Sequence, residues 1–129
     1  MQRADHFAFQ VTDMDRAIRF YVEDLGLRLL FREVSEEHEE EFAFLEVEGG
    51  NLELLKSRKG AAFVPQPPEP PYCPHLAFGT EDMSVTLEMI REKEIPIVKG
   101  PLELAGKVKW IYVNDPDHNV IEFIEWIEH

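Results

Sequence analysis

Two histidines and two glutamates recur along this chain at one fixed spacing. His75 follows His6 by 69 residues, and Glu122 follows Glu53 by the same 69 residues. Imidazole nitrogens and carboxylate oxygens together suit Zn, Ni, Co, Mn or Fe(II). Two histidines and two carboxylates on a six-coordinate ion leave two positions open for waters or a bidentate substrate. These four side chains are therefore the candidate metal ligands.

The segments around these residues repeat at the same offset. Residues 6–14 (HFAFQVTDM) match residues 75–83 (HLAFGTEDM) in His, Ala, Phe, Asp and Met. Residues 51–55 (NLELL) fall on residues 120–124 (VIEFI). One shift that serves both ends of the unit indicates an internal duplication.

Each half predicts the same order of elements, βαβββ. Asp13 and Asp82 stand where an N-cap opens a helix, and Gly26 ends the first one. Gly49-Gly50 reads as a hairpin turn. The first half predicts strand 4–11, helix 14–24 and strands 27–33, 41–48 and 51–56. The second half predicts strand 75–80, helix 83–94 and strands 96–99, 107–114 and 119–126.

The alternation along these strands separates two faces. Bulky apolar side chains such as Phe7 and Phe9 share one face, which a helix would cover. His or Glu lies on the other face beside small residues such as Ala8 and Ala77. That face has room for a ligand.

Composition limits the protein class. The chain has 129 residues, of which 44% are hydrophobic and 30% charged, so it is long enough for one domain with a real core. The formal charge is −13, which repels phosphate backbones and predicts no nucleic-acid partner. The same charge attracts divalent cations.

Cysteine and hydropathy patterns point to the cytoplasm. Cys73 is the single cysteine, which excludes an internal disulfide framework and a cysteine-based zinc site. No apolar run approaches the roughly 20 residues of a membrane span, and residues 1–5 open no signal peptide. We therefore expect a cytoplasmic protein with no membrane partner.

A proline-rich stretch divides the chain. Residues 64–71 hold five prolines, which cannot form a helix or a central strand. We expect a single domain over 1–129, with a first module at 1–60, a connector at 61–74 and a second module at 75–129. The remaining histidines, His38, His118 and His129, lie in a predicted hairpin, a predicted turn and the terminus, where we expect solvent exposure.

Three segments are similar to a known family. Residues 13–21 (DMDRAIRFY), 25–27 (LGL) and 114–122 (NDPDHNVIE) resemble the vicinal oxygen chelate superfamily. That superfamily includes glyoxalase I, methylmalonyl-CoA epimerase, extradiol dioxygenases, fosfomycin-resistance enzymes and bleomycin-binding proteins. The resemblance covers essentially the whole chain. It implies an α+β fold in which two tandem βαβββ modules form a curved, barrel-like mixed sheet with helices on the outer face.

The ligand set favours one branch of this superfamily. By resemblance, His6, Glu53, His75 and Glu122 correspond to the His-Glu-His-Glu metal set of glyoxalase I. Epimerases usually have Gln in place of Glu53, and dioxygenases and fosfomycin enzymes usually use two His and one Glu. Two positions depart from glyoxalase I. Gln10 stands where bacterial enzymes usually have an arginine that helps hold glutathione, and His118 replaces a usual glycine.

The resemblance implies a divalent-metal-dependent lyase or isomerase of the glyoxalase I type. It would act on a small-molecule substrate by proton transfer next to a carbonyl, through a metal-bound enediolate. Glu122, and Glu53 on the opposite side, would be the catalytic acid–base groups. No cofactor beyond the metal ion is expected.

Three alternatives stay open. A metal-free drug-binding protein would use the same cleft, with Phe42, Phe44, Trp110 and Tyr112 either lining it or filling the core. The others are a methylmalonyl-CoA epimerase-like enzyme and an Fe(II) extradiol dioxygenase-like enzyme. A half of about 60 residues is marginal alone, so we expect a two-fold homodimer whose metal ligands come from one chain or from two.

Overall fold

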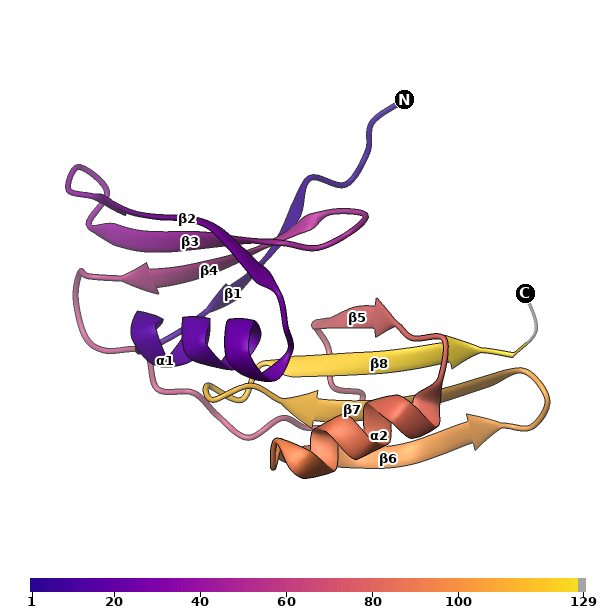
Figure 1. Cartoon of the computed structure of the whole chain (residues 1–129). Coiled ribbons are helices and arrows are strands. Elements are labelled where there is room, and N and C mark those ends of the chain that lie inside the picture. The colour runs from indigo at the N-terminus through magenta and orange to yellow at the C-terminus, as the bar shows by residue number, and fades with distance from the viewer. Residues whose placement is uncertain (128–129) are drawn as a thin grey trace. The chain divides into compact units, whose positions relative to one another are not determined.

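The computed structural model describes residues 1–127 and divides the chain into two compact units, one up to Gln66 and one from Pro67 onward. This division lies inside the proline-rich segment. The boundaries expected for the modules and the connector stay predictions. Figure 1 labels the elements of each unit.

The first unit is a four-stranded mixed sheet with one helical segment. Strand β1 is parallel to β4, and β4, β3 and β2 pair antiparallel in the order β1-β4-β3-β2. The helical segment is α-helical at first and ends in a π turn. The elements are β1 (His6–Gln10), α1 (Met14–Arg19), the π-helix η1 (Phe20–Asp24), β2 (Arg28–Ser35), β3 (Glu40–Glu46) and β4 (Asn51–Ser57).

The second unit repeats this topology. Strand β5 is parallel to β8, and the sheet order is β5-β8-β7-β6. The elements are β5 (His75–Gly79), α2 (Met83–Glu92), β6 (Ile97–Leu104), β7 (Val108–Asn114) and β8 (Val120–Trp126). The α+β class and the twofold βαβββ order are thus confirmed. The strands form two separate four-stranded sheets, and these are not closed into a barrel.

Both helices begin where the sequence predicts. The Asp13 carboxylate accepts a hydrogen bond from the Arg16 N–H at 3.1 Å, and Asp82 accepts one from the Ser84 N–H at 3.0 Å. These bonds satisfy N–H groups that the first helical turn leaves without a partner.

Strand β6 is longer than its prediction over 96–99. The strand continues to Leu104 although it contains Pro101. The pairing of β6 with β7 shifts register between Lys99 and Leu102, so the proline lies in an irregular stretch where its missing N–H breaks no regular ladder.

One face of each sheet is buried against its helix. Helix α1 contacts β3 and β4, and α2 contacts β8. In the first unit Ala17, Leu52 and Leu54 are fully buried, and in the second Ile111 and Ile121 are. The opposite faces carry the histidines and glutamates.

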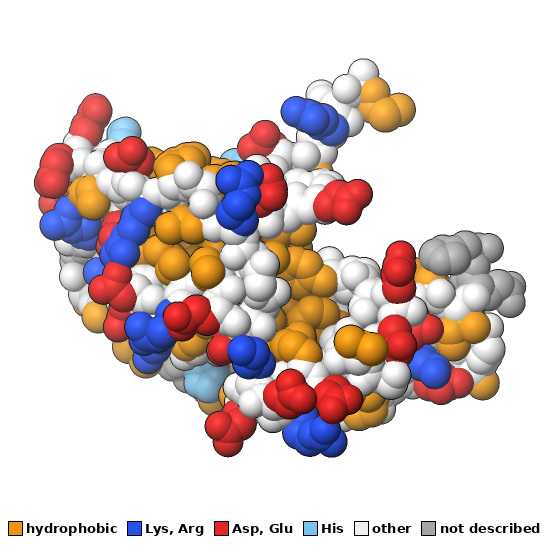
Figure 2. Space-filling view, in the orientation of Figure 1, with side chains coloured by type: hydrophobic (Ala, Val, Ile, Leu, Met, Phe, Trp, Pro, Cys, Tyr) orange, Lys and Arg blue, Asp and Glu red, His pale blue; other side chains and the backbone are white. Residues whose placement is uncertain are grey.

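On the face shown in Figure 2, charged side chains are scattered over both units, and acidic ones occur on each. His38 and His118 are exposed, as predicted, and His129 lies outside the described residues. His118 has a φ of 63°, in the left-handed region that favours glycine. Among residues 1–127, no helix is long and apolar enough to cross a membrane.

Candidate functional site

Each unit brings one histidine and one glutamate together on the face opposite its helix. In the first unit Ala8 pairs with Glu53 across the parallel strands β1 and β4, and His6 lies two residues earlier on the same face. In the second unit Ala77 pairs with Glu122, and His75 again lies two residues earlier. The alanine methyl groups leave space between the longer side chains.

The first pair is partly exposed, and neighbouring groups contact its imidazole. His6 Nε2 lies 3.4 Å from Glu53 Oε1, with 38% and 14% of the two side chains exposed. The other ring nitrogen, Nδ1, lies 2.7 Å from Asp5 Oδ2. The Phe44 ring contacts the imidazole edge-on at 5.1 Å between centroids. The imidazole is therefore held on three sides.

The second pair has the same arrangement with different partners. His75 Nε2 lies 2.8 Å from Glu122 Oε1, with 21% and 10% of the side chains exposed. Nδ1 lies 3.0 Å from the main-chain oxygen of Tyr72. Tyr112 contacts the imidazole edge-on at 5.4 Å.

The surroundings of the second pair shift the pKa of the Tyr112 phenol. Burial, and then the negative charge of Glu122, raise the pKa of Tyr112, while a hydrogen bond with Trp110 acts in the opposite direction. The neutral phenol is thus favoured beside the second pair.

The donor chemistry and spacing of each pair fit a divalent cation. Two ligands bonded at about 2.1 Å to one ion are about 3.0 Å apart at a right angle and about 3.4 Å apart at a tetrahedral angle. The observed Nε2–Oε1 separations of 2.8 Å and 3.4 Å lie close to these values. Within residues 1–127, however, no three His, Cys, Asp or Glu side chains form a group that could hold a metal ion. The structure therefore brings the four predicted ligands together as two pairs, and the four-ligand set stays a prediction.

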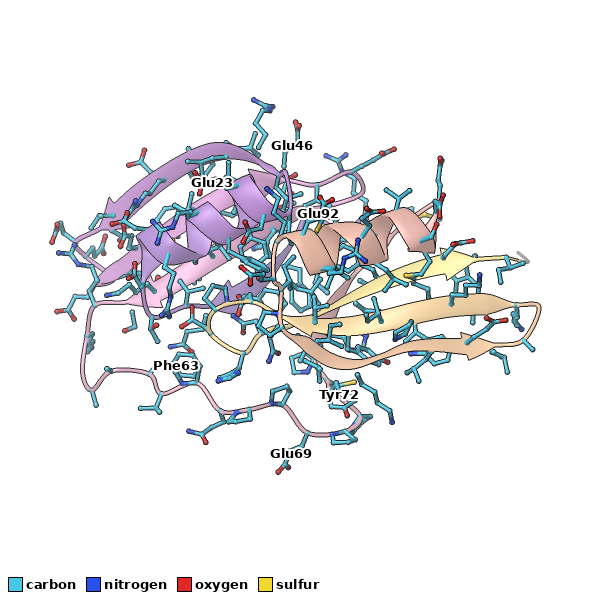
Figure 3. All side chains as sticks on the ribbon, turned by 60° about the horizontal axis from the view of Figure 1, so that its bottom comes forward. Glu23, Glu46, Phe63, Glu69, Tyr72 and Glu92 are labelled. Atoms are coloured by element: carbon cyan, nitrogen blue, oxygen red, sulfur yellow. The ribbon has the colours of Figure 1, made fainter. Side chains whose placement is uncertain are left out.

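A cavity of about 320 Å³ lies at the ends of β1 and β4. Gln10, which lies on the strand face that carries His6, lines this cavity. Lys56 also lines it and supplies a positive charge. Figure 3 shows Phe63, another lining residue, on the segment after β4. The lining residues are Gln10, Val11, Thr12, Lys56, Ser57, Ala61, Ala62 and Phe63. Sequence reasoning singled out Gln10 alone, because no periodic pattern links Lys56 to residues beyond the strand.

The four aromatics predicted either to line the cleft or to fill the core lie outside the fully buried core. Each is partly exposed, and strand register places each on the His–Glu face of its unit. They are Phe42, Phe44, Trp110 and Tyr112. Phe31, which the sequence did not single out, stacks on Phe44 with 5.1 Å between ring centroids. A partly apolar surface thus borders the first pair.

Comparison with known proteins places the chain in a family. Residues 3–123 match the model of the glyoxalase/bleomycin resistance protein/dioxygenase superfamily. The lactoylglutathione lyase of Haemophilus influenzae is 33% identical over 132 residues, which cover 93% of this chain and 90% of that protein. The chain therefore belongs to this superfamily, as the sequence motifs predict.

Solved structures agree with this assignment. The trypanothione-dependent glyoxalase I of Leishmania major is 26% identical with a TM-score of 0.71, covering 97% of this chain and 87% of that one. A glyoxalase family protein from Enterococcus faecalis is 26% identical with a TM-score of 0.76, covering 96% and 98%.

Proposed function

We propose that this protein is a divalent-metal-dependent lyase of the glyoxalase I type. The observation that carries the proposal is the repeated pair, in which a histidine Nε2 faces a glutamate oxygen while an acceptor occupies Nδ1. Membership of the superfamily and the similarity to a lactoylglutathione lyase support it.

The proposed metal ligands are His6, Glu53, His75 and Glu122. A bound Ni, Zn, Co, Mn or Fe ion would act as a Lewis acid toward the substrate oxygens. The acceptors on both Nδ1 atoms direct each Nε2 toward its glutamate, which is the orientation that a metal-binding histidine needs.

The proposed substrate is the adduct of a thiol with a 2-oxoaldehyde. In the reaction, the C–H bond on the sulfur-bearing carbon breaks, and a proton is delivered to the neighbouring carbonyl carbon. The hydroxyl oxygen loses its proton as it becomes the thioester carbonyl, and the former carbonyl oxygen gains one. Glu122 would take the carbon-bound proton on a carboxylate oxygen and return it, with Glu53 as the second acid–base group.

The first unit also offers a place for the thiol's tail. The cavity beside Gln10 contains the Lys56 ammonium and the hydroxyls of Thr12 and Ser57, which can bind a carboxylate or hydroxyl group. Gln10 stands where bacterial glyoxalase I usually has an arginine that helps hold glutathione, so the proposal extends to thiols other than glutathione. We propose that the polar tail of the thiol occupies this cavity.

Assembly and location are part of the same proposal. We propose a single domain, with modules at 1–60 and 75–129 around the 61–74 connector, that forms a cytoplasmic two-fold homodimer. Light scattering coupled to size-exclusion chromatography measures the mass in solution, and a monomer at micromolar concentration would contradict the dimer.

The test of the activity uses protein purified without chelator. Its metal content is measured first, and turnover of methylglyoxal is then followed with several thiols in the presence of Ni, Co, Zn or Mn. We expect turnover with at least one metal and thiol. Background rates in every combination would exclude the glyoxalase reaction, and binding of an apolar drug by such inactive protein would favour the metal-free binding alternative.

A further inference from the structure

In both histidines Nδ1 faces an acceptor oxygen, but the oxygen belongs to a different kind of group in each unit. Asp5 Oδ2 lies 2.7 Å from Nδ1 of His6 and belongs to the preceding residue. The main-chain oxygen of Tyr72 lies 3.0 Å from Nδ1 of His75 and belongs to a residue three positions earlier. The duplication itself does not account for this, because the acceptors come from different offsets and different chemical groups. Both units therefore place an acceptor oxygen at Nδ1.

These contacts place a proton on Nδ1 of each ring. A carboxylate and a carbonyl oxygen can only accept, so Nδ1 must donate in both rings. In the neutral ring this is the one N–H, so the lone pair of Nε2 is then available to a metal ion placed between Nε2 and the oxygen of Glu53 or Glu122. A divalent cation bound at Nε2 and at the carboxylate satisfies both groups at once.

We infer that Asp5 is a positioning residue for His6 at the metal site. Its carboxylate selects the Nδ1–H form of the ring and points Nε2 at the cation, and hydrogen bonding to a carboxylate also strengthens an imidazole as a ligand. This inference rests on the proposed function, because it assigns a role within the proposed metal site.

Asp5 is well placed for this role. Its main-chain oxygen accepts a hydrogen bond from the Asn51 N–H at 2.9 Å, and the Asn51 side chain in turn accepts one from the Val47 N–H at 3.2 Å. The backbone of Asp5 is thereby tied to the start of β4. The Asp5 side chain is 83% exposed, so its contact with His6 does not result from burial in the core.

The two units differ in how this contact can be removed. No side-chain substitution removes the main-chain oxygen that faces His75. At His6 the acceptor is a side chain, so Asp5→Ala deletes the contact and leaves the ligands unchanged. The first unit is therefore where the orientation of a metal ligand depends on a replaceable group.

The first measurement is Zn²⁺ affinity by chelator competition. We expect Asp5→Ala to weaken binding about 10- to 100-fold, and Asp5→Asn to weaken it less because its amide oxygen can still accept. The control is Glu48→Gln, which removes the same charge from an exposed turn near the start of β4. This variant should stay within roughly twofold of wild type, because exposed charges are screened. Equal affinities for Asp5→Ala and wild type would overturn the inference.

The second measurement needs no metal. The ¹⁵N shifts of the His6 ring in metal-free protein report which nitrogen is protonated. We expect Nδ1 to be protonated in wild type and to be protonated in only part of the molecules in Asp5→Ala. If wild type binds none of Zn²⁺, Ni²⁺, Co²⁺, Mn²⁺ and Fe²⁺, the proposed function fails, and the ring shifts still decide the inference. Equal protonation of Nδ1 in the two proteins would refute it.

Discussion

His75 and Glu122 form the closer and more buried of the two His–Glu pairs. Their Nε2 and Oε1 atoms are 2.8 Å apart, against 3.4 Å for His6 and Glu53. The residue opposite each glutamate also differs, since Tyr112 faces Glu122 and Phe44 faces Glu53. The duplicated halves have therefore diverged at the site, and the two carboxylates are not equivalent.

This difference predicts unequal effects of charge removal. Glu122→Gln preserves the side chain's size but removes the proton acceptor, so we expect kcat to fall roughly 10²- to 10⁴-fold. Glu53→Gln should lower kcat less, because Glu53 is proposed as the second acid–base group and its side chain is more exposed than that of Glu122. Steady-state kinetics with metal at saturation measure both, and a Glu122→Gln variant with wild-type kcat would contradict the assigned role.

The cavity at the ends of β1 and β4 predicts which part of the thiol the protein recognises. Lys56→Ala should raise KM about tenfold for adducts of carboxylate-bearing thiols, because a charge-assisted hydrogen bond is lost. Adducts of 2-mercaptoethanol should be unaffected. Lys59→Ala is the control, since the Lys59 side chain is 76% exposed and lies outside the cavity lining. Equal KM changes for both kinds of thiol would argue against a tail site here.

The helices and strands were predicted well from sequence where the hydrophobic periodicity and the internal duplication agreed. The order βαβββ and the caps Asp13 and Asp82 follow from local pattern and one repeated offset. The same offset singled out the four side chains that the structure arranges as two His–Glu pairs. The continuation of β6 past Pro101 did not follow, because register shifts depend on the partner strand β7.

The supporting groups of the site were harder to predict. Tyr72 reaches His75 through its main-chain oxygen, which is independent of residue type, from a residue with left-handed backbone at a φ of 64°. Phe63 enters the cavity lining because of the path of the chain after β4. Such contacts depend on tertiary geometry rather than on spacing. Convergence of the two pairs on one ion is a prediction of the duplication and awaits the metal measurements.

The turn before β8 should contribute strongly to stability. Buried Asp115 accepts hydrogen bonds from the Asp117 N–H at 2.8 Å, the Asn119 N–H at 2.9 Å and the Asn119 side chain at 2.8 Å. Asp115→Ala leaves these donors without their acceptor, so we expect a loss of about 1–3 kcal/mol in the free energy of unfolding. Urea denaturation measures it. Asp115→Asn retains an acceptor and should lose less, and equal losses would show that the bonds to the turn are not the cause.

Tyr112 predicts a change of stability at high pH. Burial and Glu122 raise its pKa in the folded protein above the ordinary value of 10.0. Above about pH 10 the unfolded chain therefore releases this proton while the folded protein keeps it, and the free energy of unfolding falls as pH rises toward the folded pKa. Tyr112→Phe has no proton to release, so its stability should fall less between about pH 9 and pH 11. Lysines titrate in the same range in both proteins and cancel in the comparison. Denaturation curves at several pH values give the two slopes, and equal slopes would show that the phenol does not couple to folding.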